Sequence, residues 1–407
     1  MSFGQLKLHP EILQGIRAMG FTQPTPIQSE VIPLALERQD ILGCAQTGSG
    51  KTAAFVLPIL NHLLQHPRPG LRALVLVPTR ELAAQVETVF RDCGRFTPFK
   101  VAMIIGGVGF HGQQQAVRQG AQILVATPGR LLDHLHQGSF TLSQVEQLVL
   151  DEADRMLDMG FLPDIRSILS RLPQGRQTML FSATLLPEVE RVAAFALRHP
   201  KRVEISPPTS TATGINQVVY PVKQSQKSEF LVQFLKSTQI RSVLIFCRTK
   251  HGADRLAWRL KELGFSIGVL HADRTQGQRT VAMEGFRKGK FQILVATDIA
   301  ARGIDVQEIS HVVNYDVPRH PEDYVHRVGR TARAYKVGDA VTFMDPEEQS
   351  FLTAIERFLG VVFSRAILPG FPYVTPPQLE PPKPKTFSNI RWGRRRIASS
   401  RKALFRR

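Results

Sequence analysis

Short apolar runs recur along the chain, and a polar or glycine-containing turn follows each of them directly. Six such runs are Ile41–Ala45, Leu74–Val77, Ile123–Ala126, Leu148–Leu150, Met179–Phe181 and Ile293–Ala296. Runs that are apolar throughout and rich in branched residues are typical of strands buried on both faces of a parallel sheet. Stretches with helical spacing lie between them, for example Glu81–Phe90 and Asp254–Leu263. This alternation predicts an α/β fold with doubly wound parallel sheets and right-handed crossovers.

Two pairs of similar segments indicate that the chain contains one α/β unit twice. The sequence QILVAT occupies Gln122–Thr127 and again Gln292–Thr297. RALVLVPT (Arg72–Thr79) and RSVLIFCRT (Arg241–Thr249) form a second pair at nearly the same offset. Apolar strands resemble one another by chance, but two pairs with matching separation favour duplication.

Composition divides the 407 residues into two domains, a linker and a tail. We predict a first domain over residues 1–205, a linker over 206–217, where Pro, Ser, Thr and Gly cluster, and a second domain over 218–362. Residues 363–407 contain 11 Lys and Arg against one acid, Glu380, and so hold more than half of the net charge of +18. We expect a basic, disordered tail there, with a polyanion as its partner.

A phosphate-binding loop follows the first apolar run. The segment Ala45–Thr52 reads AQTGSGKT, in which Ala45 replaces the usual first glycine. Gly48 and Gly50 allow backbone N–H groups to turn toward phosphate oxygens at a helix N-terminus. Lys51 would reach the β- and γ-phosphates, and Thr52 would offer its hydroxyl to Mg²⁺. Because the second half has no such loop, we predict one nucleotide per chain.

An acidic motif completes this site. Asp151 and Glu152 directly follow the run Leu148–Leu150 in the sequence DEAD. The carboxyl ends of parallel strands share one edge of the sheet, so these side chains should meet the phosphate loop. Asp151 would bind Mg²⁺, and Glu152 would act as the general base on the attacking water.

GSGKT, DEAD, SAT (Ser182–Thr184) and HRVGRTAR (His326–Arg333), in this order, resemble the motifs of the DEAD-box ATP-dependent RNA helicases. The resemblance covers about residues 1–345 and implies two tandem RecA-like domains with one ATP site shared between them. Phe21 and Gln28 match the adenine-recognition motif, which implies ATP over GTP. The ATP-binding residues implied by motif and resemblance are Phe21, Gln28, Ala45, Gln46, Thr47, Gly48, Ser49, Gly50, Lys51, Thr52 and Asp305.

The resemblance assigns the remaining roles residue by residue. Arg330 and Arg333 match the arginine fingers, and His326 should lie near the attacking water. Ser182 and Thr184 would couple the ATP and RNA sites. The RNA-contacting positions are Thr79, Arg80, Gly106, Gly107, Thr127, Gly129, Arg130, Gln276, Arg279 and Thr297. Such contacts hold the RNA backbone without reading bases.

Two positions depart from the family pattern, since Ala272 and Ala332 stand where glycine is common. A left-handed backbone at either position would cost about 1 kcal/mol with alanine. The short N-terminus and the absence of long insertions resemble bacterial helicases of the RhlE type.

The leading interpretation is an RNA-stimulated ATPase that melts short duplexes locally and without sequence preference, or remodels RNA–protein complexes. An ATP-controlled RNA clamp or ribosome-assembly factor with little strand separation would use the same residues, so this alternative stays open. A DNA-directed translocase is disfavoured by Phe21 and Gln28. Ribosome-assembly and RNA-decay proteins are compatible partners. Three scattered cysteines, no signal peptide and no run long enough to cross a bilayer predict a cytoplasmic protein.

Overall fold

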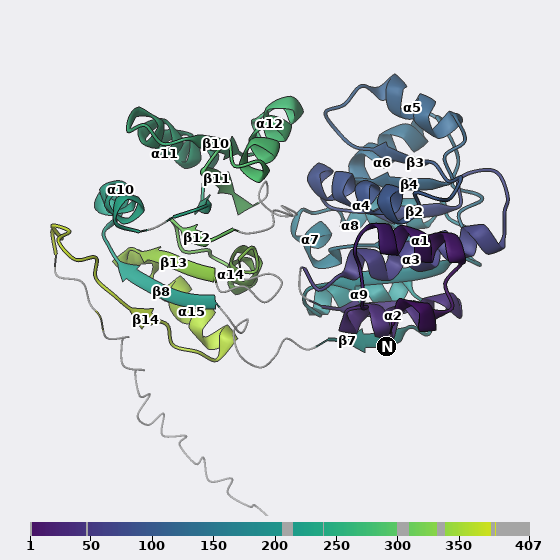
Figure 1. The fold of residues 1–407 in the computed structure, drawn as a ribbon, viewed down its shortest axis with the longest axis horizontal. Coiled ribbons are helices and arrows are strands. Elements are labelled where there is room, and N and C mark those ends of the chain that lie inside the picture. Colours follow the sequence, from purple (N-terminus) through teal and green to yellow (C-terminus); the bar gives the residue numbers. More distant parts are fainter. Residues whose placement is uncertain are drawn as a thin grey trace, which may run out of the picture.

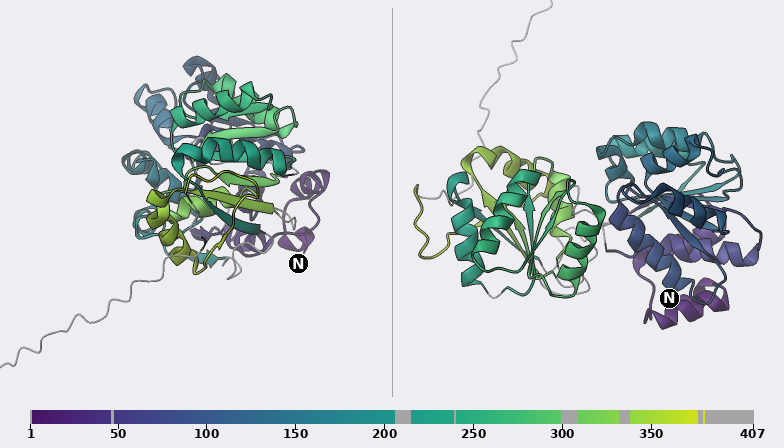
Figure 2. Two further views of the ribbon diagram at one scale, coloured as in Figure 1. Left: turned by 90° about the vertical axis from the view of Figure 1, so that its left-hand side faces the viewer. Right: turned by 90° about the horizontal axis from the view of Figure 1, so that it is seen from above.

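The computed structural model describes residues 2–45, 48–205, 215–238, 240–298, 309–331, 338–375 and 379. Two α/β domains lie side by side, the first in purple and blue and the second in green and yellow in Figure 1. Each is built around one seven-stranded parallel sheet with helices on both faces, as the views in Figure 2 also show. The predicted fold class, two tandem RecA-like domains with parallel sheets, is confirmed.

The first domain begins with a short 3-10 helix, η1 (Phe3–Leu6). Its strands are β1 (Ile41–Cys44), β2 (Ala73–Leu76), β3 (Val101–Ile104), β4 (Ile123–Ala126), β5 (Gln147–Leu150), β6 (Gln177–Ser182) and β7 (Lys201–Glu204). Its helices are α1 (Pro10–Ala18), α2 (Pro26–Leu36), α3 (Lys51–Gln65), α4 (Arg80–Cys93), α5 (Phe110–Arg118), α6 (Pro128–His136), α7 (Ala153–Asp158), α8 (Leu162–Leu169) and α9 (Pro187–Ala196).

The second domain repeats this plan. Its strands are β8 (Ile215–Pro221), β9 (Val243–Cys247), β10 (Ile267–Leu270), β11 (Ile293–Thr297), β12 (His311–Asn314), β13 (Gly338–Met344) and β14 (Ser364–Arg365). Its described helices are η2 (Gln224–Gln226), α10 (Lys227–Ser237), α11 (Lys250–Glu262), α12 (Gln276–Arg287), α14 (Pro321–Val328), η3 (Pro346–Glu348) and α15 (Gln349–Leu359).

The two sheets have the same strand order, which confirms the duplication predicted from the repeats. The first runs β3-β4-β2-β5-β6-β1-β7 and the second β10-β11-β9-β12-β13-β8-β14. The repeated QILVAT segments fall on β4 and β11, and the second repeated pair falls on β2 and β9, which are equivalent strands. Even the caps correspond: Thr79 accepts a hydrogen bond from Leu82 N (3.3 Å), and Thr249 accepts one from Gly252 N (3.0 Å).

Alternate residues of each strand enter separate hydrophobic cores, because successive side chains of a strand point to opposite faces. Val75 of β2 belongs to the core that α1–α4 cover, whereas Leu74 and Leu76 belong to the core beneath α6, α8 and α9. Such fully buried strands have no polar face, which explains the continuous apolar runs. Cys44, Cys93 and Cys247 are free thiols.

Two predicted boundaries need correction. Ile215–Gln217, placed in the linker, form the start of β8, where they pair in parallel with β13. Residues 363–375, placed in the tail, belong to the second domain. Phe363, Leu368 and Phe371 are buried in its cores. The remaining linker residues, 206–214, and most of the predicted tail lie outside the described residues.

Candidate functional site

The loop after β1 forms a tight cradle. Gly48 and Gly50 have φ of +86° and +93°, a backbone region that favours glycine. A Cβ at Gly50 would lie 2.5 Å from Gln28 Nε2 and 2.9 Å from Thr25 Oγ1, so only glycine lets α2 close over the loop. Gln46 and Thr47 lie outside the described residues.

The interior of this cradle is polar and cationic. Lys51, the first residue of α3, is 7% exposed and donates through Nζ to the Ala45 carbonyl oxygen. The Ser49 hydroxyl is buried and has no hydrogen-bond partner among the residues that the structure describes. An orphaned buried hydroxyl beside an ammonium group fits a bound anion.

The planar carboxamide of Gln28 lies against the phosphate-binding loop. Gln28 Oε1 accepts from Thr25 N (3.0 Å), and its Nε2 donates to Gly50 O (3.0 Å). A carboxamide has two acceptor sites and two N–H donors, so one of each is left to pair with a base. Phe21, an exposed ring, follows Gly20 with its φ of +75°. These groups fit a purine edge and a stacked base.

The first two carboxyl groups of the acidic motif, those of Asp151 and Glu152, differ in their pKa. Burial raises the pKa of Asp151 to about 7, although the charge of Lys51 opposes this rise. Burial would also raise the pKa of Glu152, but the charges of Arg155 and Arg330 outweigh burial and lower it to about 2. Glu152 is therefore an anion at neutral pH, and its carboxylate forms a buried ion pair with Arg155.

Asp154 ties the acidic motif to the SAT segment, a role the sequence analysis missed. Its Oδ2 accepts hydrogen bonds from Ala183 N (3.1 Å), Thr184 N (3.3 Å) and Thr184 Oγ1 (3.3 Å). Ser182 Oγ donates to Thr184 O (2.7 Å). The third carboxylate of DEAD was the available signal. The segment that follows β6 is thus held by the motif that follows β5.

Arg80 lies against a pair of glycines. A Cβ on Gly106 would approach its Nη2 to 3.0 Å, and a Cβ on Gly107 would approach its Nη1 to 2.1 Å. Gly107 also has a φ of +75°. The glycine pair therefore leaves room for the Arg80 guanidinium where β3 ends.

Arg130 is held by an aromatic stack. Its Nη2 donates to Val108 O (2.9 Å), and its guanidinium carbon lies 4.9 Å from the Phe110 ring centroid. Phe110 stacks on His134, with centroids 3.7 Å apart and planes 8° apart. His134 is fully buried, and burial and then the charge of Arg130 lower its pKa. The neutral imidazole of His134 therefore holds the Phe110 ring in place, and this ring in turn holds Arg130. Thr127 and Gly129 lie at the start of α6.

Gln276 and Arg279 join the two domains. Arg80 Nη1 donates to Gln276 Oε1 (3.3 Å). Arg279 Nη2 lies 2.8 Å from Glu81 Oε1, and these two side chains are only 12% and 7% exposed. Both predicted RNA-contacting residues of α12 therefore pair with the first turn of α4. Thr297, half-buried, ends β11.

Helix α14 brings a guanidinium toward the acidic motif. Arg330 is buried, and its Nε donates to His326 O (3.2 Å). Since the charge of Arg330 helps to lower the pKa of Glu152, the two domains interact electrostatically at this site. Arg327 anchors α14 through two bonds to Asp298, of 2.6 and 2.8 Å. Arg333 and Asp305 lie outside the described residues.

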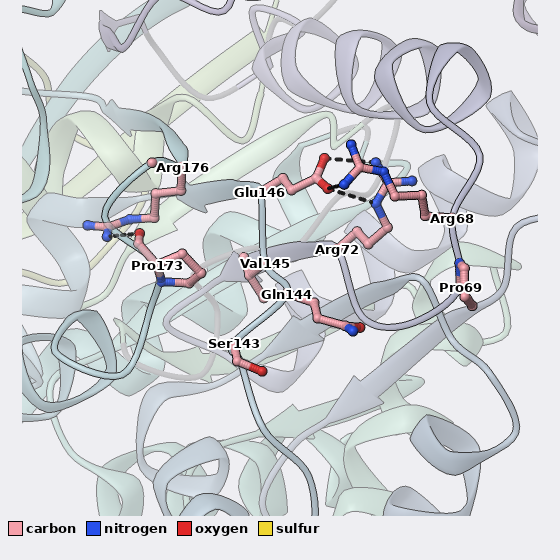
Figure 3. A pocket seen from close by; sticks show the side chains of 10 residues that line it. Arg68, Pro69, Arg72, Ser143, Gln144, Val145, Glu146, Pro173 and Arg176 are labelled. Carbon is pink, nitrogen blue, oxygen red and sulfur yellow. Dashed lines mark hydrogen bonds and ion pairs between the residues drawn. The ribbon is translucent and has the colours of Figure 1, made fainter.

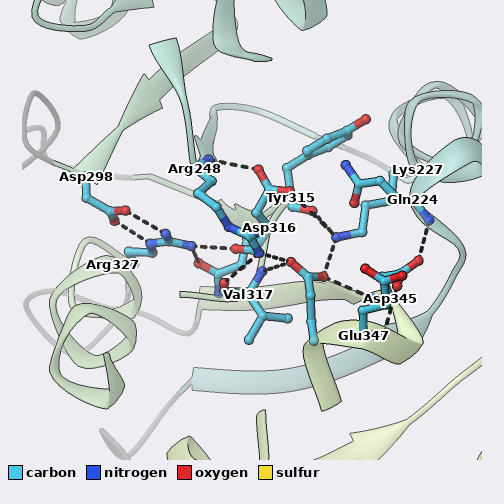
Figure 4. A network of polar contacts seen from close by, with 12 residues as sticks. Gln224, Lys227, Arg248, Asp298, Tyr315, Asp316, Val317, Arg327, Asp345 and Glu347 are labelled. Atoms are coloured by element: carbon cyan, nitrogen blue, oxygen red, sulfur yellow. Dashed lines mark hydrogen bonds and ion pairs between the residues drawn. The ribbon is translucent and has the colours of Figure 1, made fainter. Parts of the chain in front are cut away.

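The second domain has a buried lysine where the first has Lys51. Lys227 is the first residue of α10, as Lys51 is of α3. Its Nζ donates to Tyr315 O (2.8 Å) and Glu348 Oε2 (2.6 Å), and lies 3.8 Å from Asp316 Oδ1 (Figure 4). This ammonium group is fully buried and neutralised by the protein.

The departure at Ala272 carries no backbone strain. Ala272 is not among the described non-glycine residues with positive φ, which are Lys7, Arg38, Glu152 and His199. The expected cost of a methyl group in a left-handed conformation therefore does not arise there. Ala332 lies outside the described residues.

A phosphate loop, a buried acid pair and an arginine from a second parallel sheet define a two-domain P-loop nucleoside triphosphatase. The sequence profile of the DEAD/DEAH box helicases matches residues 25–192, and that of the helicase conserved C-terminal domain matches residues 226–335. The DEAD-box ATP-dependent RNA helicase CshA of Bacillus subtilis (strain 168) is 42% identical over 357 residues, 88% of this chain and 72% of the relative. The chain belongs to the family of DEAD-box ATP-dependent RNA helicases.

Solved structures agree with this assignment and bear on the domain arrangement. Saccharomyces cerevisiae Dbp5 bound to RNA and ADP BeF3 is 33% identical, with a TM-score of 0.82 over 90% of this chain and 95% of that one. A Dbp5 variant bound to Nup159, a Gle1 variant, IP6 and ADP is 32% identical, with a TM-score of only 0.63 over 89% and 96%. The two domains are thus arranged more as in the RNA-bound structure.

The protein is therefore an ATP-dependent RNA helicase, and it hydrolyses ATP and binds RNA. The RhlE-type assignment stays a prediction. Within the described residues, no helix combines the length and apolar character needed to cross a lipid bilayer.

Proposed function

We propose that one ATP binds between the two domains and that its hydrolysis requires both. Lys51 would neutralise the β- and γ-phosphates, and residues 45–52 would surround them with N–H groups. Gln28 would pair with the adenine edge while Phe21 stacks on its face. Asp305 would contact the ribose. The observation that supports this proposal most is the contact between the domains, where Arg279 Nη2 lies 2.8 Å from Glu81 Oε1. The charge of Arg330, which lowers the pKa of Glu152, agrees with it.

The charged residues divide the chemical work. Glu152, an anion at neutral pH, would accept the proton of the attacking water, and His326 would lie beside that water. Arg330 and Arg333 would neutralise charge that develops on the γ-phosphate. Since the base belongs to one domain and the guanidinium groups to the other, only the closed arrangement is complete.

Magnesium fits this site as the ion that neutralises phosphate charge. Thr52 and Asp151 would hold it. Among the described residues, no group of three or more His, Cys, Asp or Glu could hold a metal without the nucleotide. One hydroxyl and one carboxylate, from Thr52 and Asp151, suit Mg²⁺, because this ion binds through one or two carboxylates together with substrate phosphates.

RNA would lie across the same edge of the two sheets. Arg80 and Arg130 would contact its phosphates, with Thr79, Gly106, Gly107, Thr127, Gly129 and Thr297 allowing close approach of the backbone. Gln276 and Arg279 would act mainly by joining α12 to α4. Ser182 and Thr184, held by Asp154, would link this surface to the nucleotide. Closing on one strand would melt a short duplex locally, without base recognition.

Replacing Arg330 tests the shared site. We expect Arg330→Ala to lose most RNA-stimulated ATP hydrolysis, by about 10²-fold or more, because an arginine that stabilises transferring phosphate supplies at least that factor. The chain should still bind a fluorescent ATP analogue, since the phosphate loop is intact. Arg319→Ala, an exposed arginine of the same domain, is the control. An unchanged rate in Arg330→Ala would refute hydrolysis at a shared site.

A strand-separation assay with a matched dwell-time measurement on RNA would separate unwinding from the clamp alternative. We further propose residues 1–205 and 215–375 as the two folding units. A cytoplasmic location, consistent with three free cysteines, is also proposed. Co-purification with ribosome-assembly or RNA-decay proteins would test the proposed partners.

A further inference from the structure

Basic residues gather at the sheet edge opposite the ATP and RNA motifs. In the first domain, the loops from strand to helix contain two charged residues, Asp151 and Glu152. The loops from helix to strand contain eight Lys and Arg against three Asp and Glu. These loops are residues 37–40, 66–72, 94–100, 119–122, 137–146, 170–176 and 197–200. In a parallel sheet they all lie at the amino ends of the strands.

The positive charge at this edge faces solvent, whereas most of the negative charge is neutralised. Asp40 is buried and accepts hydrogen bonds from Thr178 N (2.8 Å) and Arg198 N (2.7 Å). Glu146 is held by Arg72 Nη2 (2.7 Å) and His62 Nε2 (2.6 Å). Only Glu37 is an exposed acid. The exposed basic side chains are Arg38, Arg68, Arg95, Lys100, Arg171 and Arg198.

A pocket of about 490 Å³ opens at the centre of this edge, where β2, β5 and β6 begin. Arg68 and Arg176 lie on opposite sides of it, with Glu146 and its partners between them (Figure 3). Arg68 forms a long ion pair with Glu146 Oε1 (3.7 Å), but its side chain is 67% exposed, so most of its guanidinium group faces solvent. Gly70, with a φ of +94°, lets Gln144 pack closely, since a Cβ there would lie 1.9 Å from Gln144 Oε1.

Arg176 is held in an unfavourable environment. Its Nη1 donates to Pro173 O (2.9 Å), but its buried Nε has no hydrogen-bond partner within the described part of the chain. Burial, and then the charge of Arg198, lower its pKa. A partly desolvated guanidinium near a like charge gains free energy when an anion arrives.

We propose that this amino-end edge of the first domain is a second RNA-binding surface, and that its pocket, between Arg68 and Arg176, receives a phosphate group of RNA flanking the segment bound at the opposite edge. The ligand chemistry is a phosphate. Seven of the eight basic residues are arginines, whose guanidinium groups bind phosphate in pairs of hydrogen bonds. The pocket walls offer Pro69, Val145 and Pro173 but no large apolar anchor of the kind that a protein partner requires.

The surface is tested with a triple variant of the full chain, Arg68→Gln, Arg176→Gln and Arg198→Gln. The matched control removes the same charge from exposed arginines outside this edge, with Arg17→Gln, Arg91→Gln and Arg191→Gln. Dissociation constants are measured over a range of salt with a short single strand and with a long RNA that carries a flanking duplex. A nucleoside monophosphate and poly-glutamate serve as competitors for the long RNA.

We expect the triple variant to bind the long RNA about tenfold more weakly than the control, with a salt slope smaller by roughly 2, because about 2–3 phosphate contacts are lost. The short strand should bind both variants equally and stimulate their ATPase equally. The result therefore distinguishes failure of the proposed second RNA surface from failure of the shared ATP site. Competition by the monophosphate in the control alone would identify a terminal phosphate as the ligand. Equal binding of the long RNA by both variants overturns the proposal. If poly-glutamate alone discriminates between them, the surface binds an acidic protein segment instead.

Discussion

Glu152 combines an uncommon backbone conformation with a buried charge. Its φ of +52° and ψ of +52° place a glutamate in the left-handed region, which costs about 1–2 kcal/mol for a residue with a Cβ. The ion pair with Arg155 and the start of α7 hold it there. Strain of this kind concentrates at functional sites. It supports the proposal that the position of this carboxylate serves catalysis.

Glu152→Gln should bind ATP and RNA but hydrolyse ATP about 10²–10⁴-fold more slowly, because an amide cannot accept the proton of water. Steady-state ATPase rates and binding of a fluorescent nucleotide measure the two effects. Arg155 loses its anionic partner, so the melting temperature should also fall. Glu190→Gln, an exposed pair partner on α9, is the control. Normal turnover in the Glu152 variant would remove it as the base.

Phe110→Leu should raise the RNA concentration needed for half-maximal ATPase about 3–10-fold, because the ring that supports Arg130 is lost. The rate at saturating RNA should not change, since the nucleotide site is untouched. Phe110→Tyr keeps the stack and should restore affinity. Phe195→Leu, at an exposed phenylalanine of α9 that also lies beneath an arginine, controls for lost apolar surface. The proposed role of the stack is wrong if Phe110→Leu and Phe195→Leu behave alike.

Sequence could predict residues whose position follows from topology. Lys51, Asp151 and Glu152 each follow a strand, and the carboxyl ends of parallel strands lie at the same edge of the sheet. The stack of Phe110 on His134 depends on side-chain rotamers and burial, which spacing does not specify. The ion pair of Arg279 with Glu81 depends on how two domains meet, so no pattern within one domain reveals it.

At the element scale, a cluster of ion pairs at Glu146 lies directly before β5. Hydrogen bonds from Arg72 and His62 outweigh the opposite effect of burial and lower the pKa of Glu146 to about 2. A carboxyl group with a pKa below its unfolded value of about 4.3 stabilises the fold above that pH. This stabilisation is lost as the pH falls from about 4.3 toward 2.

We expect Glu146→Gln to lower the free energy of unfolding at pH 7 by about 1–3 kcal/mol, because Arg72 is left buried without its anion. Urea denaturation at pH 7 and at pH 3 measures it, and the deficit should shrink at the lower pH. Glu37→Gln, on the same edge but exposed, should have no such effect. A deficit independent of pH would contradict the assigned pKa.

Strand boundaries were predicted well where an apolar run ends directly at a polar turn, and poorly at the ends of the domains. The Gly-, Ser- and Thr-rich segment before β8 hides the point at which pairing with β13 begins, because Asn216 and Gln217 read as linker residues. The segment 363–375 reads as tail since it is rich in proline. Gln226 nevertheless binds it at both amide atoms, to Pro372 O (2.8 Å) and Val374 N (3.0 Å).

At the scale of the whole molecule, this boundary decides where the tail can be removed. Deleting residues 376–407 removes ten Lys and Arg and one Glu but leaves every described anchor of the second domain. We expect weaker RNA binding and a flatter salt dependence, because fewer counterions are released. Titrations of RNA at several salt concentrations measure both, and an unchanged slope would exclude the tail from binding.

A longer deletion provides the contrast. Removing residues 363–407 also removes Phe363, Leu368 and Phe371, which should destabilise the second domain by roughly 5 kcal/mol or more. Loss of RNA binding in that chain would report unfolding, which circular dichroism detects. Comparing the two deletions therefore separates electrostatic binding from folding.

The buried ammonium of Lys227 makes the duplicated halves unequal. In topology it corresponds to Lys51, and Asp316, two residues beyond β12, corresponds to Glu152 beyond β5. In the second domain the ammonium group of Lys227 is already paired with the carboxylate of Glu348. It is therefore not free to neutralise a triphosphate. The second domain thus has no unpaired ammonium group at the position where the first domain has Lys51. Under the proposed function, one nucleotide then controls the contact between both domains.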